Sequence, residues 1–130
     1  MTAFPAQFQD WFASRGWSIH PHQQDMLNLA AVPALLLVAP TGGGKTLAGF
    51  LPTLTELSNS SHDGLHTLYI SPLKALAADI KRNLQTPVVE MSLPIRIEDR
   101  TGDTTQTQKK KQRADPPHIL LTTPESLALL

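Results

Sequence analysis

Lys45 and Thr46 carry the side chains in this sequence that are best suited to binding a phosphate group. They directly follow three consecutive glycines at positions 42–44. Glycines let the backbone fold tightly enough for successive N–H groups to point inward at one anion. A lysine at this spacing can reach the β- and γ-phosphates of a nucleotide, and the threonine hydroxyl beside it can bind Mg²⁺. The pattern therefore predicts a phosphate-binding loop that ends in Lys45 and Thr46.

The segments on either side of this loop predict the strand and the helix between which such a loop works. The apolar run at 34–38 is expected to form the strand. The helix after the loop would turn its positive N-terminal end toward the bound anion. The strict loop pattern begins with glycine, where this chain has Ala39, so a glycine-rich turn without a ligand stays open as the alternative. Pro52 should kink or shorten the helix, whose apolar face comprises Leu47, Phe50, Leu51 and Leu54.

The overall composition predicts a small domain without a general affinity for nucleic acid. The 130 residues suffice for one domain or less, and 11 basic residues balance 11 acidic ones. Any nucleic-acid binding must therefore come from individually placed groups. No cysteine is present, which excludes disulfides and cysteine-ligated zinc. Residues 1–5 do not read as a signal peptide, and no apolar run is long enough to cross a bilayer. We expect a cytoplasmic protein with no membrane partner.

The aromatic residues near the N-terminus predict a helix that packs by its aromatic face. Apolar positions recur at helical spacing, and Gly16 is a plausible end. Core packing is the favoured interpretation, although the same rings could stack on nucleobases. A second helix is expected from Pro21 to about Ala31, with Met26, Leu27 and Ala30 facing inward. The residues on the aromatic face are Phe4, Phe8, Trp11, Phe12 and Arg15.

Two glutamines and two histidines lie at the start of this second helix. Gln23 and Gln24 carry amides that can both donate and accept, which suits the edge of an adenine. Helical glutamines are ordinarily surface residues, so this interpretation depends on the phosphate-binding loop that follows. His20 and His22 make no metal site without further ligands, and we interpret them as structural or exposed.

The second half of the chain alternates predicted strands with predicted helices. Residues 67–70 and 118–121 are typical of buried strands, whereas residues 95–98 alternate apolar and polar types as a half-exposed strand would. Strands that alternate with helices imply a parallel sheet with right-handed crossovers. Residues 100–103 are expected to turn. The lysines at 109–111 are most simply part of a solvated helix or loop, with phosphate contact as the lesser alternative.

One arrangement occurs three times: a strand ends, a proline follows one residue later, and a helix begins. Ser71 is a natural N-cap and Pro72 a natural first helical residue, while Pro87 and Pro94 should punctuate the chain after that helix. In a parallel sheet the three turns would share one edge and present helix-start N–H groups, which bind anions. Ser-Pro and Thr-Pro are also ordinary helix starts, and spacing alone does not separate the two interpretations. The three turns are Ala39-Pro40, Ser71-Pro72 and Thr123-Pro124.

These motifs resemble those of superfamily 2 helicases. The loop Ala-Pro-Thr-Gly-Gly-Gly-Lys-Thr at 39–46 resembles motif I, in which alanine often opens the loop. Residues 71–79 resemble motif Ia, residues 100–104 resemble the glycine motif after it, and residues 122–127 resemble motif Ib. Together the four motifs are similar to the large helicase-related (Lhr) family, and the likeness runs from about Phe8 to the end of the chain. The Trp-rich start and the Arg-Thr-Gly-Asp-Thr sequence point to its ligase-associated DEXH-box branch.

The resemblance implies a fold and a function. The fold is α/β, a P-loop (RecA-like) three-layer sandwich with a parallel sheet, here an incomplete first helicase domain. Residues 1–33 would form N-terminal helices with a Q-motif-like segment, and residues 34–130 a partial ATP-binding domain. The function would be that of an ATP-dependent DNA helicase in DNA repair, acting on single-stranded or partly duplex nucleic acid, DNA rather than RNA. An ATP-dependent DNA ligase is a possible partner by family association.

The resemblance also assigns residues to the site. Gln23 would read adenine, with Gln24 as the fallback, while Lys45 and Thr46 would be catalytic and Thr46 would bind Mg²⁺. Contacts to the sugar–phosphate backbone carry no base information, so binding without sequence preference is expected. The residues that would hold ATP with Mg²⁺ are Gln23, Thr41, Gly42, Gly43, Gly44, Lys45 and Thr46. Those that would contact the nucleic-acid backbone are Pro72, Leu73, Lys74, Thr101, Gly102, Thr122 and Thr123.

Two parts of such an enzyme are not among these residues. The Asp-Glu-x-His motif, whose carboxylates complete the Mg²⁺ site, would follow the next strand, and the second RecA-like domain supplies an arginine finger. We therefore expect this chain to be inactive alone. Two alternatives are a P-loop phosphotransferase or ATPase acting on a small molecule, which explains the glycine loop but not the later turns, and a non-catalytic interaction module.

Overall fold

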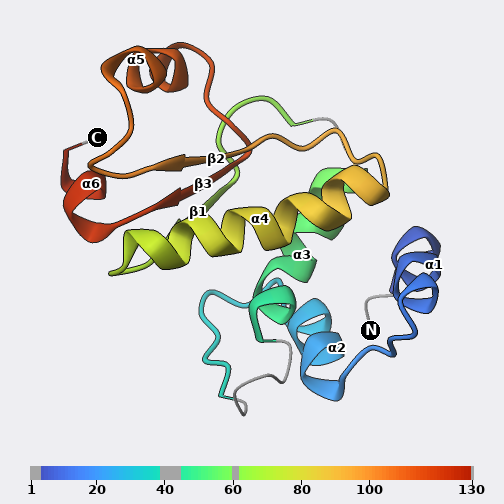
Figure 1. The fold of residues 1–130 in the computed structure, drawn as a ribbon. Coiled ribbons are helices and arrows are strands. Elements are labelled where there is room, and N and C mark those ends of the chain that lie inside the picture. Colours follow the sequence, from blue (N-terminus) through green and yellow to red (C-terminus); the bar gives the residue numbers. More distant parts are fainter. Residues whose placement is uncertain (1–3, 39–44, 60–61, 130) are drawn as a thin grey trace. The chain divides into compact units, whose positions relative to one another are not determined.

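The computed structural model describes residues 4–38, 45–59 and 62–129. The chain forms two compact units, Met1–Asn59 and Ser60–Leu130, and each is described by itself. Figure 1 gives the order of the helices and strands along the chain. The helices in the described ranges are all too short or too polar to cross a lipid bilayer.

Helix α1, Ala6–Ser14, buries the aromatic face that the sequence predicts. Phe8, Trp11 and Phe12 are all buried, and the rings of Phe4 and Phe12 meet edge to face with centroids 5.0 Å apart. Gly16 ends this helix in a left-handed conformation with φ near +70°, which glycine adopts without strain. The prediction that this face packs into a core is confirmed.

Helix α2, Pro21–Asn28, begins with proline at its first position, as predicted. Leu27 is buried, Met26 is half-buried, and Ala30 is exposed. The prediction that the helix reaches Ala31 with Ala30 inward is therefore wrong. Leu29 already caps the C-terminus, and the Ala30 N–H turns back to the Leu27 carbonyl, so Ala30 lies on a turn.

Helix α3, Lys45–Asn59, begins where the glycine loop is predicted to end and packs against α2. The predicted apolar face is confirmed by the burial of Phe50, Leu51 and Leu54, with Leu47 half-buried. Pro52 does not shorten the helix, which continues to Asn59. Proline removes one hydrogen-bond donor, but burial of the residues around it holds the helix together.

The apolar run at 34–38 does not form the predicted strand. It has no regular structure, and Leu36 is 90% exposed. A strand exists only through hydrogen bonds to a neighbouring strand, and within the described residues the strands pair only with one another. Apolar composition alone was the signal, and it says nothing about whether a partner is available.

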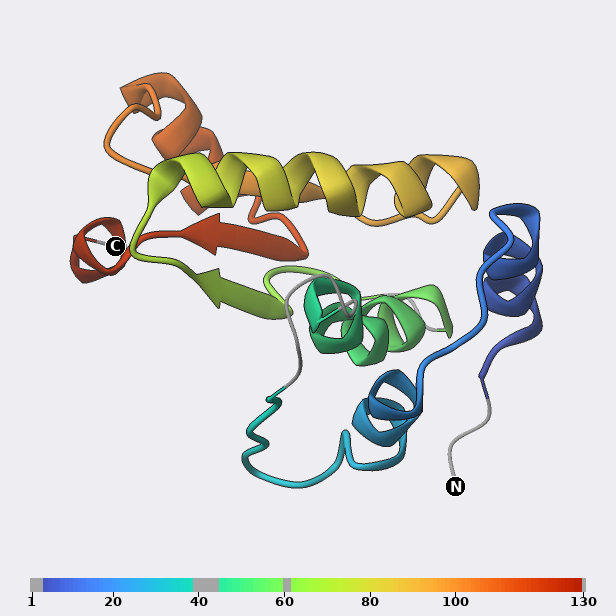
Figure 2. The ribbon, with the colours of Figure 1, turned by 60° about the horizontal axis from the view of Figure 1, so that its bottom comes forward.

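The second unit is built on a parallel sheet of three strands, β1 (Thr67–Ile70), β2 (Ile97–Arg100) and β3 (Ile119–Thr122). The order across the sheet is β1-β3-β2, and all pairings are parallel, which confirms the predicted α/β class. Figure 2 shows β1 and β3 as neighbouring arrows with the same direction. The last residues of the strands, Ile70, Thr122 and Arg100, share one row, so the carboxyl ends form one edge.

Burial differs sharply between the central and the outer strands. All four residues of β3 are buried, as predicted for this segment. The prediction that β1 is buried is wrong, since Leu68 and Ile70 are 43% and 48% exposed. Strand β1 lies at the edge of the sheet, and the other described residues of this unit leave the side of β1 that carries Leu68 and Ile70 exposed. Strand β2 begins two residues later than predicted, because residues 95 and 96 precede its first paired residue, Ile97.

Helix α4, Lys74–Glu90, lies along one face of the sheet, as Figures 1 and 2 show. It begins later than predicted, because Leu73 has extended backbone angles and occupies the N-cap position that we assigned to Ser71. The prediction that Pro72 opens the helix is wrong for the same reason. Pro87 does not interrupt the chain either, since it lies buried in the last turn of α4.

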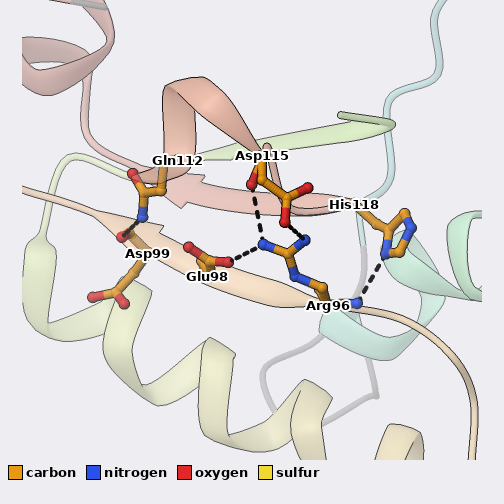
Figure 3. A network of polar contacts seen from close by, with 6 residues as sticks. All are labelled: Arg96, Glu98, Asp99, Gln112, Asp115 and His118. Carbon is orange, nitrogen blue, oxygen red and sulfur yellow. Dashed lines mark hydrogen bonds and ion pairs between the residues drawn. The ribbon is translucent and has the colours of Figure 1, made fainter. Parts of the chain in front are cut away.

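Helix α5, Gln106–Ala114, is the polar segment that carries the lysine run, and it is a helix as one of the two alternatives proposed. Thr105 caps it by accepting a hydrogen bond from the Gln108 N–H. Near its end, Gln112 Nε2 donates to the Asp99 carbonyl of β2 at 3.0 Å (Figure 3). This bond fixes α5 to the outer side of an edge strand.

A second network fixes the amino ends of β2 and β3 to each other (Figure 3). The Arg96 guanidinium binds Glu98 and Asp115, both at 2.9 Å, and these two acceptors raise the pKa of Arg96. The Arg96 N–H donates to His118 Nδ1 at 2.9 Å. The strands are therefore held in register at the end opposite to the predicted binding edge.

Candidate functional site

Lys45 and Thr46 are the first two residues of α3, and both are exposed. No acidic residue lies in the first turn of this helix, so the positive end of the helix and the Lys45 ammonium act together. A cation and a hydroxyl at an exposed helix N-terminus suit a triphosphate and its Mg²⁺. The predicted binding residues Thr41, Gly42, Gly43 and Gly44 lie outside the described residues.

Gln23, the predicted adenine-reading residue, has a structural task in the same unit. Its Oε1 accepts a hydrogen bond of 2.8 Å from the His20 N–H and so caps the start of α2. The residue is 2% exposed. Gln24, the fallback, donates from Nε2 to Asn28 Oδ1 at 3.0 Å along the helix surface. The adenine contact stays a prediction for both residues.

The predicted nucleic-acid contacts gather at the carboxyl edge of the sheet in the second unit. Ser71 follows β1 and is buried, and its N–H donates to the Thr122 carbonyl at 3.0 Å. The Ser71 hydroxyl lies 3.3 Å from the Leu73 nitrogen and accepts its N–H. This turn holds Pro72, Leu73 and Lys74 on the surface, where all three are exposed.

The turn after β2 is closed by threonine hydroxyls. The Thr101 N–H donates to Thr104 Oγ1 at 2.9 Å, and the Asp103 N–H donates to Thr101 Oγ1 at 3.2 Å. Gly102 is exposed, and no atom within 4 Å would meet a Cβ added to it. Asp103 reaches Lys74 across the edge in an ion pair of 2.9 Å. The turns after β1 and β2 therefore meet through their side chains.

The two threonines of the turn after β3 have different roles: Thr122 is buried in the sheet edge, and Thr123 caps a helix. Thr122 is buried, and its hydroxyl donates to the Arg100 carbonyl. Thr123 is the N-cap of α6, Pro124–Ala128, and its Oγ1 accepts the Ser126 N–H at 3.4 Å. The predicted helix start at Thr123-Pro124 is confirmed. Of the other two predicted turns, Ala39-Pro40 lies outside the described residues, and Ser71-Pro72 precedes a helix without starting it.

Two residues that shape this edge from within were not predicted to do so. Ser71 was assigned as a cap but links β1 to β3, and Arg100 was assigned to a turn but is a buried strand residue. In the described ranges no group of three or more His, Cys, Asp or Glu side chains could hold a metal ion. The assignment of Thr46 as Mg²⁺ ligand stays a prediction from the sequence.

A parallel α/β sheet with its turns on one edge, and a lysine–threonine pair that opens a helix after a glycine loop, define the class of P-loop nucleotide-binding proteins. A model of the DEAD/DEAH box helicase family matches residues 20–130. The chain belongs to this family. Within superfamily 2 it groups with the Lhr helicases, as the sequence motifs predict.

Two curated relatives and one solved structure support this placement. The chain is 39% identical to a Lhr helicase/probable uracil glycosylase of Mycolicibacterium smegmatis, over 98% of this chain and 9% of that protein. It is also 39% identical to an ATP-dependent helicase Lhr-Core protein 2 of Thermococcus barophilus, over 93% of this chain and 16% of that protein. The structure of the Mycobacterium smegmatis helicase Lhr bound to ssDNA and AMP-PNP matches with a TM-score of 0.86 and 39% identity, over 97% of this chain and 18% of that one.

These matches confirm the RecA-like fold class and the family. The chain spans only 9% and 16% of the length of the two curated relatives, so the similarity concerns one part of those proteins. The individual binding residues and the ligase-associated branch stay predictions.

Proposed function

We propose that this chain supplies the ATP-binding residues and part of the strand-binding edge of an ATP-dependent DNA helicase that acts in DNA repair. The observation that carries the proposal is the exposed Lys45–Thr46 pair at the N-terminus of the 15-residue helix α3. The relative whose structure was solved with ssDNA and AMP-PNP favours DNA over RNA as the partner and ATP as the nucleotide.

The residues of the chain have distinct tasks in this proposal. Lys45 places a positive charge against the β- and γ-phosphates, and the N–H groups of the first turn of α3 point toward the same anion. The Thr46 hydroxyl binds the Mg²⁺ that accompanies the nucleotide. ATP supplies the phosphoanhydride bond whose hydrolysis drives movement, and Mg²⁺ neutralises the charge that develops there.

The carboxyl edge of the sheet binds the sugar–phosphate backbone of one strand. Pro72, Leu73 and Lys74 are exposed after β1, and the Thr101–Gly102 turn lies beside them through the Lys74–Asp103 pair. Thr122 and Thr123 contribute through the turn that leads from β3 into α6. None of these groups reads a base edge, so binding is independent of sequence.

Several finer parts of the proposal come from the family. The carboxylates that complete the Mg²⁺ site and the arginine finger of a second RecA-like domain are supplied from outside these residues, so the 130-residue chain alone is expected not to turn over ATP. The protein works in the cytoplasm, and an ATP-dependent DNA ligase is its partner by family association.

The test is the ATPase rate of the full-length gene product with and without single-stranded DNA. Stimulation by DNA, its loss in Lys45→Ala, and no turnover by the 130-residue chain are expected. Lys81→Ala, on the surface of α4, is the matched control and should keep the DNA-stimulated rate. DNA-independent turnover would favour phosphoryl transfer to a small molecule. Normal function of Lys45→Ala would favour a non-catalytic module.

A further inference from the structure

Arg100, the last residue of β2, is a buried cation without a partner among the residues that the structure describes. It is 3% exposed, and its guanidinium makes no hydrogen bond or ion pair with them. Buried arginines are almost always paired, because an uncompensated charge away from water is costly. Three side-chain atoms of the described residues are fully buried and lack a hydrogen-bond partner: His22 Nε2, Thr55 Oγ1 and Gln112 Oε1. The nitrogens of Arg100 are not among them, so its guanidinium keeps some contact with solvent.

Arg113 of α5 is a second cation beside Arg100. Burial lowers the pKa of Arg100 most, and the positive charge of Arg113 lowers it further. The two guanidinium groups are therefore close enough to repel each other. The contact between Gln112 and the Asp99 carbonyl involves the residues directly before each arginine (Figure 3). The last turn of α5 is therefore held against the end of β2, and two like charges are kept together there.

Among the described residues no ion pair joins an acidic side chain to Arg100 or Arg113, and four acidic side chains of this unit bind other cations. Asp99 pairs with Lys81 on the α4 side at 3.1 Å, and Asp103 pairs with Lys74 at 2.9 Å. Glu98 and Asp115 both bind Arg96, as Figure 3 shows. The surroundings thus leave two guanidinium groups with open donors at the carboxyl end of β2.

We propose that Arg100 and Arg113 bind one backbone phosphate of the nucleic-acid strand, next to the Thr101–Gly102 turn. The inference rests on the proposed function, since the strand must run along this edge of the sheet. Guanidinium groups suit phosphate because their planar donors can bind two of its oxygens at once. Lys109 and Lys110 lie one helical turn before Arg113 and add to the same positive field. The binding surface therefore continues from the sheet edge onto α5.

The test is a salt series of binding to a fluorescent oligothymidylate, using the full-length gene product with Arg113→Gln. Arg113 is exposed, so this substitution leaves the core intact. We expect binding about tenfold weaker at low salt. The slope of log K against log salt should also be smaller, by at most roughly 0.7, the value for one lost phosphate contact on a single strand, because Arg100 still faces the same phosphate. Arg113→Lys should restore the slope but only part of the affinity, because lysine keeps the charge without the planar donors.

Arg82→Gln is the matched control, because Arg82 is an exposed arginine of α4 that pairs with Asp79. It removes the same charge and should leave both affinity and slope unchanged. If Arg113→Gln behaves like Arg82→Gln while the unsubstituted protein binds the oligonucleotide normally, the phosphate site is wrong and the proposed function stands. If the unsubstituted protein does not bind the oligonucleotide, the proposed function fails, and this inference fails with it.

Discussion

Thr122 Oγ1 donates a hydrogen bond of 2.7 Å to the carbonyl oxygen of Arg100, across the carboxyl ends of β3 and β2. Thr122 has no exposed surface, so its hydroxyl serves the interior of the sheet edge. The bond fixes the backbone from which the Thr101–Gly102 turn departs. The Thr122 carbonyl is occupied as well, because it accepts the Ser71 N–H at 3.0 Å, so the contact from Thr122 to a nucleic-acid strand stays a prediction.

Thr122→Val should destabilise the sheet edge without altering nucleic-acid binding directly. Valine keeps the shape of the side chain but loses the hydroxyl, and a lost buried hydrogen bond costs about 1 kcal/mol. Amide hydrogen exchange in β3 of the full-length gene product measures this loss. Thr122→Ser, which keeps the hydroxyl, is the control. Weaker DNA binding with unchanged exchange would show instead that the hydroxyl contacts the strand.

Lys74→Gln should weaken nucleic-acid binding while leaving stability almost unchanged. Lys74 and Asp103 are 62% and 74% exposed at their side chains, and surface ion pairs contribute only about 0–1 kcal/mol. Loss of one phosphate contact should lower the salt slope by roughly 0.7. The control is Lys81→Gln, since Lys81 pairs with the half-buried Asp99 on the α4 face of β2. That variant should affect thermal stability more than binding, and the reverse order would contradict the assignment.

Gln23→Ala separates a capping role from an adenine-reading role. Loss of the capping bond to the His20 N–H should destabilise α2 by about 1 kcal/mol. If Gln23 also reads adenine, the KM for ATP should rise several-fold more than the KM for GTP. Gln24→Ala should leave the capping bond of α2 intact, and a selective rise of the KM for ATP in that variant would assign the adenine contact to Gln24, the fallback. Equal KM changes for ATP and GTP would leave capping as the only role of Gln23.

Trp11→Ala and Trp17→Ala should test whether the aromatic cluster binds nucleobases. Trp11 is buried, and its loss should cost about 3–5 kcal/mol of local stability, as for other large core aromatics. Trp17 is 47% exposed and should cost less. Arg15 lies over both rings, 5.3 and 5.4 Å from their centroids, so one face of each is already covered. We expect Trp17→Ala to leave oligonucleotide affinity unchanged, and a clear loss of affinity would favour base stacking.

Sequence patterns predicted the elements whose signals are local. The aromatic spacing of α1, the proline at the start of α2 and the cap of α6 at Thr123 all depend on residues within a few positions, and the structure has each of them. Short β-branched and apolar runs also marked the strands predicted at 67–70 and 118–121, and the second of these lies one residue later in the structure, at Ile119–Thr122. Local propensity and the final fold agree at these places.

The errors arose where the outcome depends on distant partners. The run at 34–38 is as apolar as β3, yet only β3 has strands on both sides to pair with. Strand β1 was predicted to be buried because the composition of a strand does not tell whether it lies at the centre or the edge of a sheet. Arg100 is buried at the end of β2, and no residue pattern within β2 predicts that burial, because it depends on neighbours distant in the sequence.

The bond from Gln112 to Asp99 makes the two edges of the sheet different. The Arg96 carbonyl accepts the Ile119 N–H, so the alternation along β2 turns the Asp99 carbonyl outward, where Gln112 caps it. On the other side, the outer backbone groups of β1 have no strand beside them within the described residues. An added strand can therefore extend the ladder at β1, whereas at β2 the side chain of Gln112 already occupies the outward carbonyl of Asp99. Another chain can pair with an unprotected edge strand, so β1 is the edge of the described sheet at which misassembly is expected.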